Sequence, residues 1–227
     1  MAKKSSKSKA QVQNAEIGEA LSRTEQYIEN NKTLIAIVTA VIIALIVGIW
    51  AANNFYFKPR QVKALEALVP GEKLFQAGNY QAALDGDNYD YEGFDAVIKQ
   101  FKCTKAANLA RAYAGLSHAQ LGQFTEAIPY LQKFKGKDHM IAPSVLAALG
   151  NCYAQQEDYS KAAATLVKAA KKADNNLLSP AYLVQAGQLY EQLGDKATAL
   201  KLYQQVKDKY YQSTQASDIE KYIERVK

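Results

Sequence analysis

The sequence predicts an all-α protein in which a single N-terminal transmembrane helix precedes an α-solenoid of helical repeats and a C-terminal capping helix. Three observations support this fold class. Residues 34–52 form an uncharged apolar run, three later segments resemble one another at spacings of 35 and 37 residues, and the last residues have amphipathic helical spacing. A period in this range is typical of helix pairs that stack into a solenoid.

The apolar run LIAIVTAVIIALIVGIWAA, residues 34–52, contains no charged side chain. Because a helix rises about 1.5 Å per residue, this run just crosses a hydrocarbon core that is roughly 30 Å thick. A cleaved signal peptide has a shorter apolar stretch followed by an A-x-A cleavage site, whereas this run is longer and the pairs Ile49/Ala51 and Trp50/Ala52 give no such pattern. Aromatic residues at its end, Trp50 and Phe55 to Phe57, are typical of a membrane interface. We therefore expect a transmembrane helix over residues 33–52.

The segments around this helix indicate its orientation. Residues 1–13 are polar, so we expect a disordered cytoplasmic tail, and residues 14–32 are expected to form an amphipathic helix beside the membrane. That helix either lies on lipid or contacts a membrane partner, and its acidic character argues against anionic lipid. Basic residues flank the apolar run almost evenly, but the MAKKSSKSK start and the long domain beyond favour a cytoplasmic N-terminus. The side chains expected to contact a partner in the membrane are Ile42, Ile46 and Trp50.

The three repeated segments match when Gly115, Gly150 and Gly187 are aligned. A glycine at this position lets the two helices of a repeat cross closely, since a side chain would hold them apart. An alanine follows twelve residues later in each segment, at Ala127, Ala162 and Ala199. Large apolar residues are expected to fill the space beside the glycines: Leu131, Leu166 and Tyr203.

The turn between the helices of each repeat carries Gly122, Glu157 or Gly194. A left-handed backbone at the end of a helix suits glycine, so Glu157 departs from the pattern. Thr125 and Ser160 are expected to cap the second helices of their repeats, and Ser179 is expected to cap the first helix that begins at Pro180.

These patterns divide the rest of the chain. A linker helix is expected over residues 53–70 and a degenerate first repeat over 71–105, in which the insertion DGDNYDY interrupts the helical pattern. Full repeats are expected over residues 106–141, 142–178 and 179–213. Residues 214–227 are expected to form the capping helix, since the last repeat of a solenoid has no neighbour to cover its apolar face.

The net charge of +6 is spread thinly over the 227 residues. Beyond the apolar run, the dense group of cations Lys168, Lys171 and Lys172 fits the last turn of a helix, so nucleic acid is not expected as a partner. The two cysteines are too few for a disulfide framework. Cys152 is expected to be a buried thiol, although one bridge to Cys103 remains an alternative.

The sequence contains no constellation that supports catalysis. His118 and His139 have no partners at metal-ligand spacing, and Ser117 lies in a helical segment that lacks the final glycine of a hydrolase elbow. The acidic residues Asp85, Asp87 and Asp90 lack the downstream Glu of a calcium loop and are interpreted as a solvated turn. We expect no enzyme activity, no metal, no cofactor and no small-molecule substrate.

The remaining candidate site is a groove on the first helices of the repeats. Positions two, five, nine, twelve and thirteen of each repeat are expected to face it, which makes the groove amide-rich and mildly apolar. The groove either holds an extended or helical peptide or consists of solvated helix faces. The candidate residues are Leu109, Ala112, Leu116, Gln120, Asn151, Gln155, Gln188, Glu191 and Gln192.

The spacing and the repeated positions resemble those of the tetratricopeptide repeat. A tail with the segment RTEQYIENNK, one membrane helix and such an array together resemble the YfgM-like ancillary subunits of the bacterial Sec translocon. The resemblance implies a single-pass protein of the bacterial inner membrane, with a periplasmic C-terminal domain that binds the SecYEG channel and a chaperone of the PpiD type. The alternative is a tethered docking protein of another envelope assembly, such as a secretion or gliding complex.

Overall fold

The computed structural model of the protein describes residues 27–87 and 89–227. The chain divides into two compact units, residues 1–58 and 59–227. Every regular element in the described residues is a helix, which confirms the predicted all-α class. The expected tail at residues 1–13 and most of the expected amphipathic helix at residues 14–32 lie outside the described residues.

The first unit contains the apolar helix α2 (Lys32–Ala51) and the π-helical segment η1 (Ala52–Phe57). Helix α2 has 20 residues, is long and apolar enough to cross a membrane, and has no buried residue within the described part of the chain. At its end Trp50 and Phe55 form an edge-to-face pair with ring centroids 6.2 Å apart, and Lys58 donates to Asn54 Oδ1 at 3.0 Å. Aromatic rings beside polar side chains suit the boundary between lipid and water.

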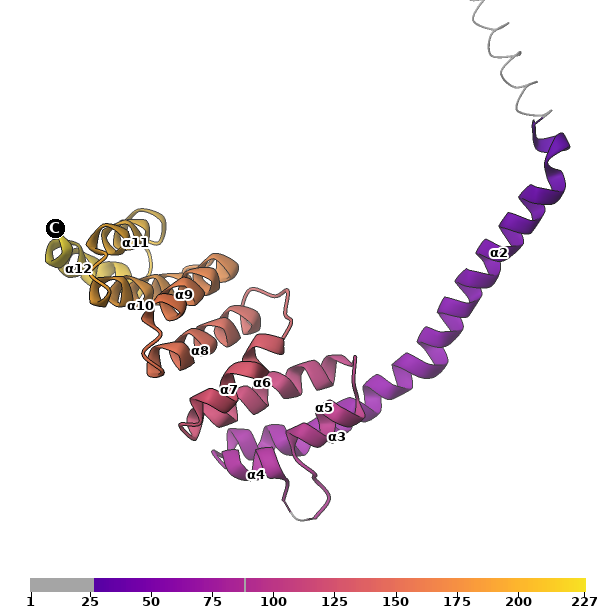
Figure 1. Cartoon of the computed structure of the whole chain (residues 1–227), viewed down its shortest axis with the longest axis horizontal. Helices are drawn as coiled ribbons and strands as arrows, with labels where there is room; N and C mark the ends of the chain where they lie inside the picture. The colour runs from indigo at the N-terminus through magenta and orange to yellow at the C-terminus, as the bar shows by residue number, and fades with distance from the viewer. Residues whose placement is uncertain (1–26, 88) are drawn as a thin grey trace, which may run out of the picture. The chain divides into compact units, whose positions relative to one another are not determined.

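The second unit is built from helices that pair in chain order, as Figure 1 shows. Helix α3 (Lys58–Gln76) precedes two short helices, α4 (Tyr80–Asp85) and α5 (Phe94–Gln100). Three pairs follow: α6 (Lys105–Gln120) with α7 (Phe124–Lys133), α8 (Ile141–Gln155) with α9 (Tyr159–Ala173), and α10 (Ser179–Gln192) with α11 (Lys196–Lys209). The chain ends in the 3-10 turn η2 (Thr214–Asp218) and helix α12 (Ile219–Val226). Because α9 packs against both α8 and α10, neighbouring pairs share one core, as in a solenoid.

Glycines allow the paired helices to cross closely. A Cβ atom added to Gly115 would lie 2.7 Å from side-chain atoms of Leu131, and one added to Gly187 would lie 2.3 Å from the ring of Tyr203. The middle pair has the same arrangement, with Gly150 against Leu166. The predicted pairing of each glycine with a large residue on the second helix is confirmed.

The turns between paired helices share one backbone conformation. The turn residue has a positive φ in all four cases: 78° at Gly78, 75° at Gly122, 61° at Glu157 and 80° at Gly194. The N–H of the next residue then bonds to the carbonyl five residues earlier, as Asp195 does to Tyr190 at 2.8 Å. This is the Schellman arrangement, which satisfies carbonyls at the end of a helix.

The predicted N-caps of the second helices are wrong by two residues. The cap of α7 is Gln123 rather than Thr125, and the cap of α9 is Asp158 rather than Ser160. Asp158 and Asp195 each accept a hydrogen bond from the backbone N–H three residues later, at 3.2 and 3.0 Å. The helices begin early because the Schellman turn reverses the chain within a single left-handed residue, so the residue that follows it is already the cap.

Ser179 does not cap α10 either, because the N-cap is Leu178. The Ser179 hydroxyl donates to Ala170 O at 2.8 Å and accepts from Asn175 N at 3.1 Å. It therefore joins the end of α9 to the loop before α10.

A loop separates α4 from α5, where the sequence predicts an insertion. Asp87 Oδ1 accepts from the backbone N–H groups of Tyr89 and Tyr91 at 3.0 and 3.1 Å, and these bonds lower the pKa of the Asp87 carboxyl. Tyr91 Oη donates to Ala83 O at 2.9 Å. A Cβ atom on Gly71 would lie 2.1 Å from Tyr91 Oη, so the Tyr91 side chain from this loop packs directly against Gly71 of α3.

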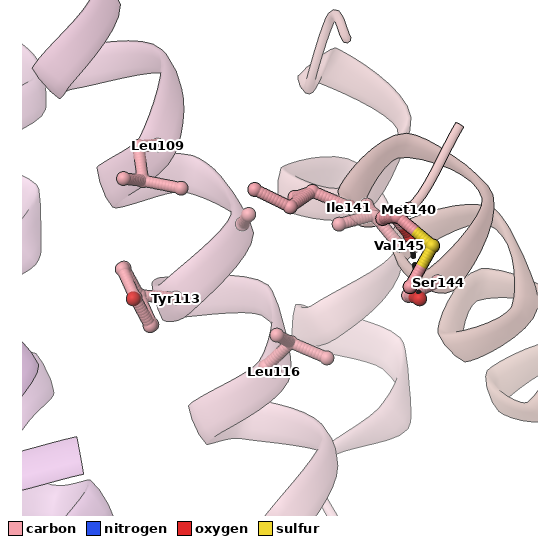
Figure 2. A pocket seen from close by; sticks show the side chains of 8 residues that line it. Leu109, Tyr113, Leu116, Met140, Ile141, Ser144 and Val145 are labelled. Carbon is pink, nitrogen blue, oxygen red and sulfur yellow. Dashed lines mark hydrogen bonds between the residues drawn. The ribbon is translucent and has the colours of Figure 1, made fainter. Parts of the chain in front are cut away.

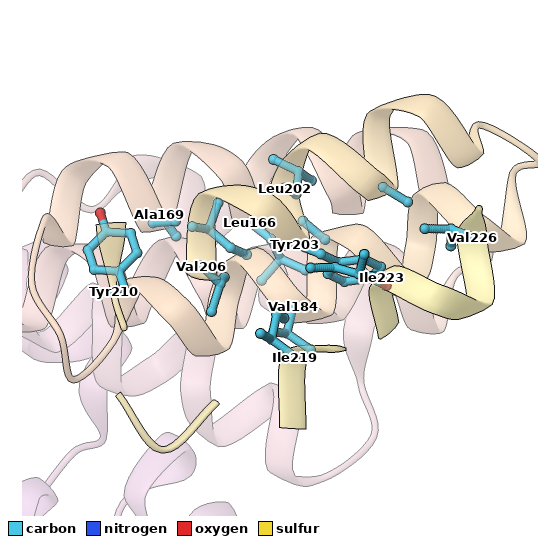
Figure 3. Packing of buried hydrophobic residues seen from close by; sticks show 14 of the residues in the cluster. Leu166, Ala169, Val184, Leu202, Tyr203, Val206, Tyr210, Ile219, Ile223 and Val226 are labelled. Atoms are coloured by element: carbon cyan, nitrogen blue, oxygen red, sulfur yellow. The ribbon is translucent and has the colours of Figure 1, made fainter. Parts of the chain in front are cut away.

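Tyr203 lies in the middle of the C-terminal core (Figure 3). Val184 from α10 and both Ile219 and Ile223 from α12 are buried in the same cluster. Helix α12 thus covers the last repeat, as the sequence predicts for a cap. The α-helix begins at Ile219 rather than at 214, because residues 214–218 form a 3-10 turn that Ser213 caps through its hydroxyl.

Both cysteines are free. Cys103 is exposed at the turn before α6, whereas Cys152 is buried in α8, as expected for a structural thiol. Burial raises the pKa of the Cys152 thiol to about 11.

The strained turn at Glu157 generates a stability prediction. Replacing Glu157 with Gly should raise the free energy of unfolding by about 1 kcal/mol, because a side chain disfavours the left-handed backbone. Chemical unfolding of the purified full chain in mild detergent, followed by circular dichroism, measures this change. The matched variant Gly194→Glu should lower the free energy by a similar amount, since no atom lies within 4 Å of a Cβ built there. An unchanged midpoint for both variants would contradict the strain argument.

Candidate functional site

One set of positions on α3, α6, α8 and α10 remains at least partly exposed. Each of these helices contains one aligned glycine: Gly71, Gly115, Gly150 or Gly187. The positions are six and two residues before this glycine and one and five residues after it, and none of them is buried. Their spacing places them on one side of each helix. We call this surface the first-helix face. It consists of Leu65, Val69, Glu72 and Gln76 on α3, Leu109, Tyr113, Leu116 and Gln120 on α6, Ser144, Ala148, Asn151 and Gln155 on α8, and Ala181, Gln185, Gln188 and Gln192 on α10.

The chemistry of the first-helix face changes along the solenoid. On α3 and α6 it is mainly apolar, whereas on α8 and α10 it consists of amides and small side chains. A glutamine occupies the last position on all four helices, and none of the four is buried: Gln76, Gln120, Gln155 and Gln192. An amide both donates and accepts hydrogen bonds, so this row suits the backbone of a bound polypeptide.

An apolar pocket of about 310 Å³ lies between α6 and the start of α8. Figure 2 shows Leu109, Tyr113 and Leu116 on one helix facing Met140 and Ile141 across the pocket. Met140 and Ile141 are 49% and 52% exposed, so apolar surface at the rim remains in contact with water. Such a surface is typical of a site that receives an apolar side chain from a partner.

The structure brings only some of the predicted groove residues to this pocket. Leu109, Ala112 and Leu116 line it, and Ala112 is buried at 2% exposure. The predicted amides Gln120, Asn151, Gln155, Gln188 and Gln192 are at least partly exposed and do not line it. Sequence reasoning missed five lining residues: Tyr113, Met140, Ile141, Ser144 and Val145. The helical spacing from Leu109 would have found Tyr113, but Met140 precedes α8, and no periodic pattern covers it.

Tyr113 forms the wall of the pocket nearest α3. Its ring stacks on Phe94 with centroids 5.6 Å apart and meets Phe75 edge to face at 5.1 Å. Burial raises the pKa of Tyr113, and the nearby Glu72 carboxylate adds to this effect. These contacts hold the ring in one orientation, so the wall is pre-formed.

Glu191, also predicted to face the groove, is engaged by the capping helix. Arg225 donates to both of its carboxylate oxygens, from Nε at 2.8 Å and from Nη2 at 2.7 Å, and Tyr203 Oη donates to Oε1. The Arg225 guanidinium is the main cause of the lowered pKa of Glu191. The carboxylate therefore ties α10 to α12.

The residues considered for catalysis, Ser117, His118 and His139, are either buried or close to a group of a neighbouring segment. Ser117 is fully buried inside α6, and its hydroxyl has no hydrogen-bond partner among the described residues. His118 Nδ1 lies 2.7 Å from Gln123 Oε1, and His139 Nδ1 lies 2.9 Å from Lys172 O. Across residues 27–87 and 89–227, no group of three His, Cys, Asp or Glu side chains is placed to hold a metal ion.

The side chains predicted to contact a membrane partner lie on one side of α2. Ile42, Ile46 and Trp50 follow one another at four-residue spacing and are 50%, 61% and 61% exposed. This side of the helix is accessible within the first unit.

Comparisons with known proteins agree with the helical repeats. Residues 145–178 and 181–213 each match a family described as tetratricopeptide repeat. No match is found among curated proteins. The fold is similar to crystal structures of nearly identical TPR-like repeats from a Podosopora anserina putative kinesin light chain and from a point variant of that protein. Both superpose with a TM-score of 0.53 at 14% identity, covering 74% of this chain and 86% or 85% of theirs. The fold is thus similar to that of tetratricopeptide-like repeats, and two segments of the second unit match the repeat itself.

The ion pair of Glu191 predicts a pH dependence. The pKa of the Glu191 carboxyl is lower in the folded protein than in the unfolded chain. The ion pair therefore contributes to stability above the unfolded pKa of about 4.3, and this contribution is lost as the pH falls through the lower folded value. Glu191→Gln should lower the free energy of unfolding by about 1 kcal/mol at neutral pH, because Arg225 is half exposed. Chemical unfolding of the full chain at several pH values should show this difference shrinking toward acid. A difference that stays constant with pH would exclude the ion pair as its cause.

Proposed function

We propose that the protein is a membrane-anchored scaffold that holds a segment of another protein on the first-helix face. The observation that carries this proposal is the apolar pocket beside exposed Met140 and Ile141, which continues into a row of amides. An apolar residue of a bound segment fits the pocket, and amides pair with the polar backbone beside it. The pocket has few polar atoms that would select one small molecule, so a polypeptide is the better occupant.

Helix α2 serves as the anchor in this proposal. Its length and the aromatic residues at its end suit a single crossing of the bilayer. We assign the N-terminus to the cytoplasm and the solenoid to the periplasm of a bacterial inner membrane, on the charge of the first residues and the length of the translocated domain.

The partner proposed for this scaffold is the Sec translocon. The order of a short tail, one apolar helix and a tetratricopeptide-like solenoid supports the resemblance to YfgM-like subunits. In this role the protein binds SecYEG beside the membrane helix, and its solenoid recruits a PpiD-type chaperone or holds newly exported segments. A docking role in another envelope assembly, such as a secretion or gliding complex, is the second candidate, because the same pocket and anchor serve it equally.

The pocket predicts a loss of binding on polar substitution. A photo-crosslinking residue that replaces Ser144 should trap bound polypeptide in cells. Adding the double substitution Met140→Ser/Ile141→Ser should lower the yield of this crosslink about tenfold, because two apolar contacts are removed. Gel electrophoresis of the purified protein measures the yield. Leu177→Ser is the matched control, since Leu177 is 67% exposed and lies outside the pocket. Equal losses in both variants would exclude the pocket as the binding site.

The membrane helix generates a separate prediction. A photo-crosslinking residue at Ile42 or Ile46 should trap a SecYEG subunit, whereas the same residue at Ala44, on the opposite side of α2, should not. Mass spectrometry after purification in mild detergent identifies the trapped protein. Recovery of a different membrane complex without translocon components would favour the second candidate.

A further inference from the structure

A strongly basic surface covers the region where α5, α6 and α7 meet. Lys105, Arg111, Lys133 and Lys135 line one cleft of about 690 Å³. Arg111 and Lys133 also line an adjoining cleft of about 370 Å³, to which Lys99 is added. We call these five cations the basic surface.

Within residues 27–87 and 89–227, no ion pair neutralises the basic surface. Residues 96–137 contain seven lysines and arginines but a single acidic residue, Glu126. The one carboxylate that lines either cleft belongs to Asp95, and Tyr130 Oη donates to its Oδ1 at 2.7 Å. No cation of the basic surface forms an ion pair with any residue that the structure describes. By contrast, four exposed lysines of α9, α11 and α12 are each paired with a carboxylate: Lys161, Lys207, Lys209 and Lys221.

The basic surface lies where the second unit begins. Lys105 N donates to Gln61 Oε1 at 3.0 Å, and the guanidinium of Arg60 bonds to Gln100 O and lies 5.8 Å from the centroid of the Phe101 ring. Gln61 follows Phe57 by four residues, and four residues span at most about 14 Å. The turn that carries Lys105 is therefore bound to chain that cannot move far from the end of the apolar helix.

We propose that the basic surface binds the anionic headgroups of the bilayer in which α2 is anchored. This inference rests on the membrane anchor of the proposed function. Lysine and arginine side chains near an anionic membrane are attracted within about a Debye length, roughly 8 to 10 Å. The short connection to α2 keeps the headgroups at a high effective concentration, which an acidic segment of a separate protein does not have. Lipid is thus the occupant that the connection favours, and its binding restrains the solenoid at the membrane surface.

The exposed thiol of Cys103 provides a direct probe, because it lines the first cleft and Cys152 is buried. The full chain is labelled at Cys103 with an environment-sensitive fluorophore and reconstituted in vesicles that contain a headgroup nitroxide lipid as quencher. Quenching should be about threefold greater in vesicles in which about one third of the lipid is phosphatidylglycerol than in vesicles of phosphatidylcholine alone. A salt concentration of about 0.5 M should remove this difference.

A matched pair of variants identifies the residues responsible. In the first triple variant, Lys105→Gln/Lys133→Gln/Lys135→Gln, quenching of the Cys103 label should no longer depend on phosphatidylglycerol. The control Lys168→Gln/Lys171→Gln/Lys201→Gln removes the same charge from exposed lysines outside both clefts and should keep this dependence. Circular dichroism of both variants verifies that the solenoid remains folded.

The outcomes separate the anchor from the basic surface. Flotation of the protein with vesicles in alkaline carbonate reports on the anchor alone, and failure to float would overturn the anchor and this inference together. If the protein floats but quenching is the same in both lipids, the basic surface does not bind lipid and only this inference fails. Protection of Cys103 by polyglutamate in that case would assign the surface to an acidic protein segment.

Discussion

The close crossing of paired helices at a glycine is the constraint on which the second unit depends. Gly115, Gly150 and Gly187 each leave room for one large side chain from the following helix, and no Cβ fits there without displacing it. Because every pair crosses at the same point, the first helices present the same positions to the outside. The first-helix face and its pocket are consequences of that regularity, and so is the apolar end that α12 covers.

Three kinds of surface are separated on the protein. The first unit offers an apolar helix with an aromatic end, the first-helix face offers an uncharged pocket and amides, and the basic surface carries unpaired cations. Each suits a different environment: hydrocarbon, polypeptide and anionic headgroups. The proposed function depends on this separation, because a ligand groove that also attracted lipid would be blocked at the membrane.

The sequence predicted the helices, their pairing and three residues of the pocket, because those features follow from local periodicity. It did not predict Met140 and Ile141 as pocket residues, since they lie at the very start of α8, outside the repeated positions, and reach the pocket only by packing. It interpreted Glu191 as a groove residue, since nothing local shows that Arg225 lies beside it across 34 positions. The cap assignments at Thr125 and Ser160 failed because residue preference was used without the geometry of the preceding turn.

Charge illustrates the division between local and long-range information. The sequence predicted that Lys168, Lys171 and Lys172 end a helix, and two of them, Lys171 and Lys172, lie in the last turn of α9. The basic surface draws on residues from 99 to 135, which belong to different helices and gather only when α5, α6 and α7 pack. The apolar run and the repeats are contiguous patterns, so the amino-acid order is sufficient to establish an apolar helix and a solenoid. The pocket rim, the ion pair of the cap and the basic surface join residues distant in the chain, so folding alone brings them together.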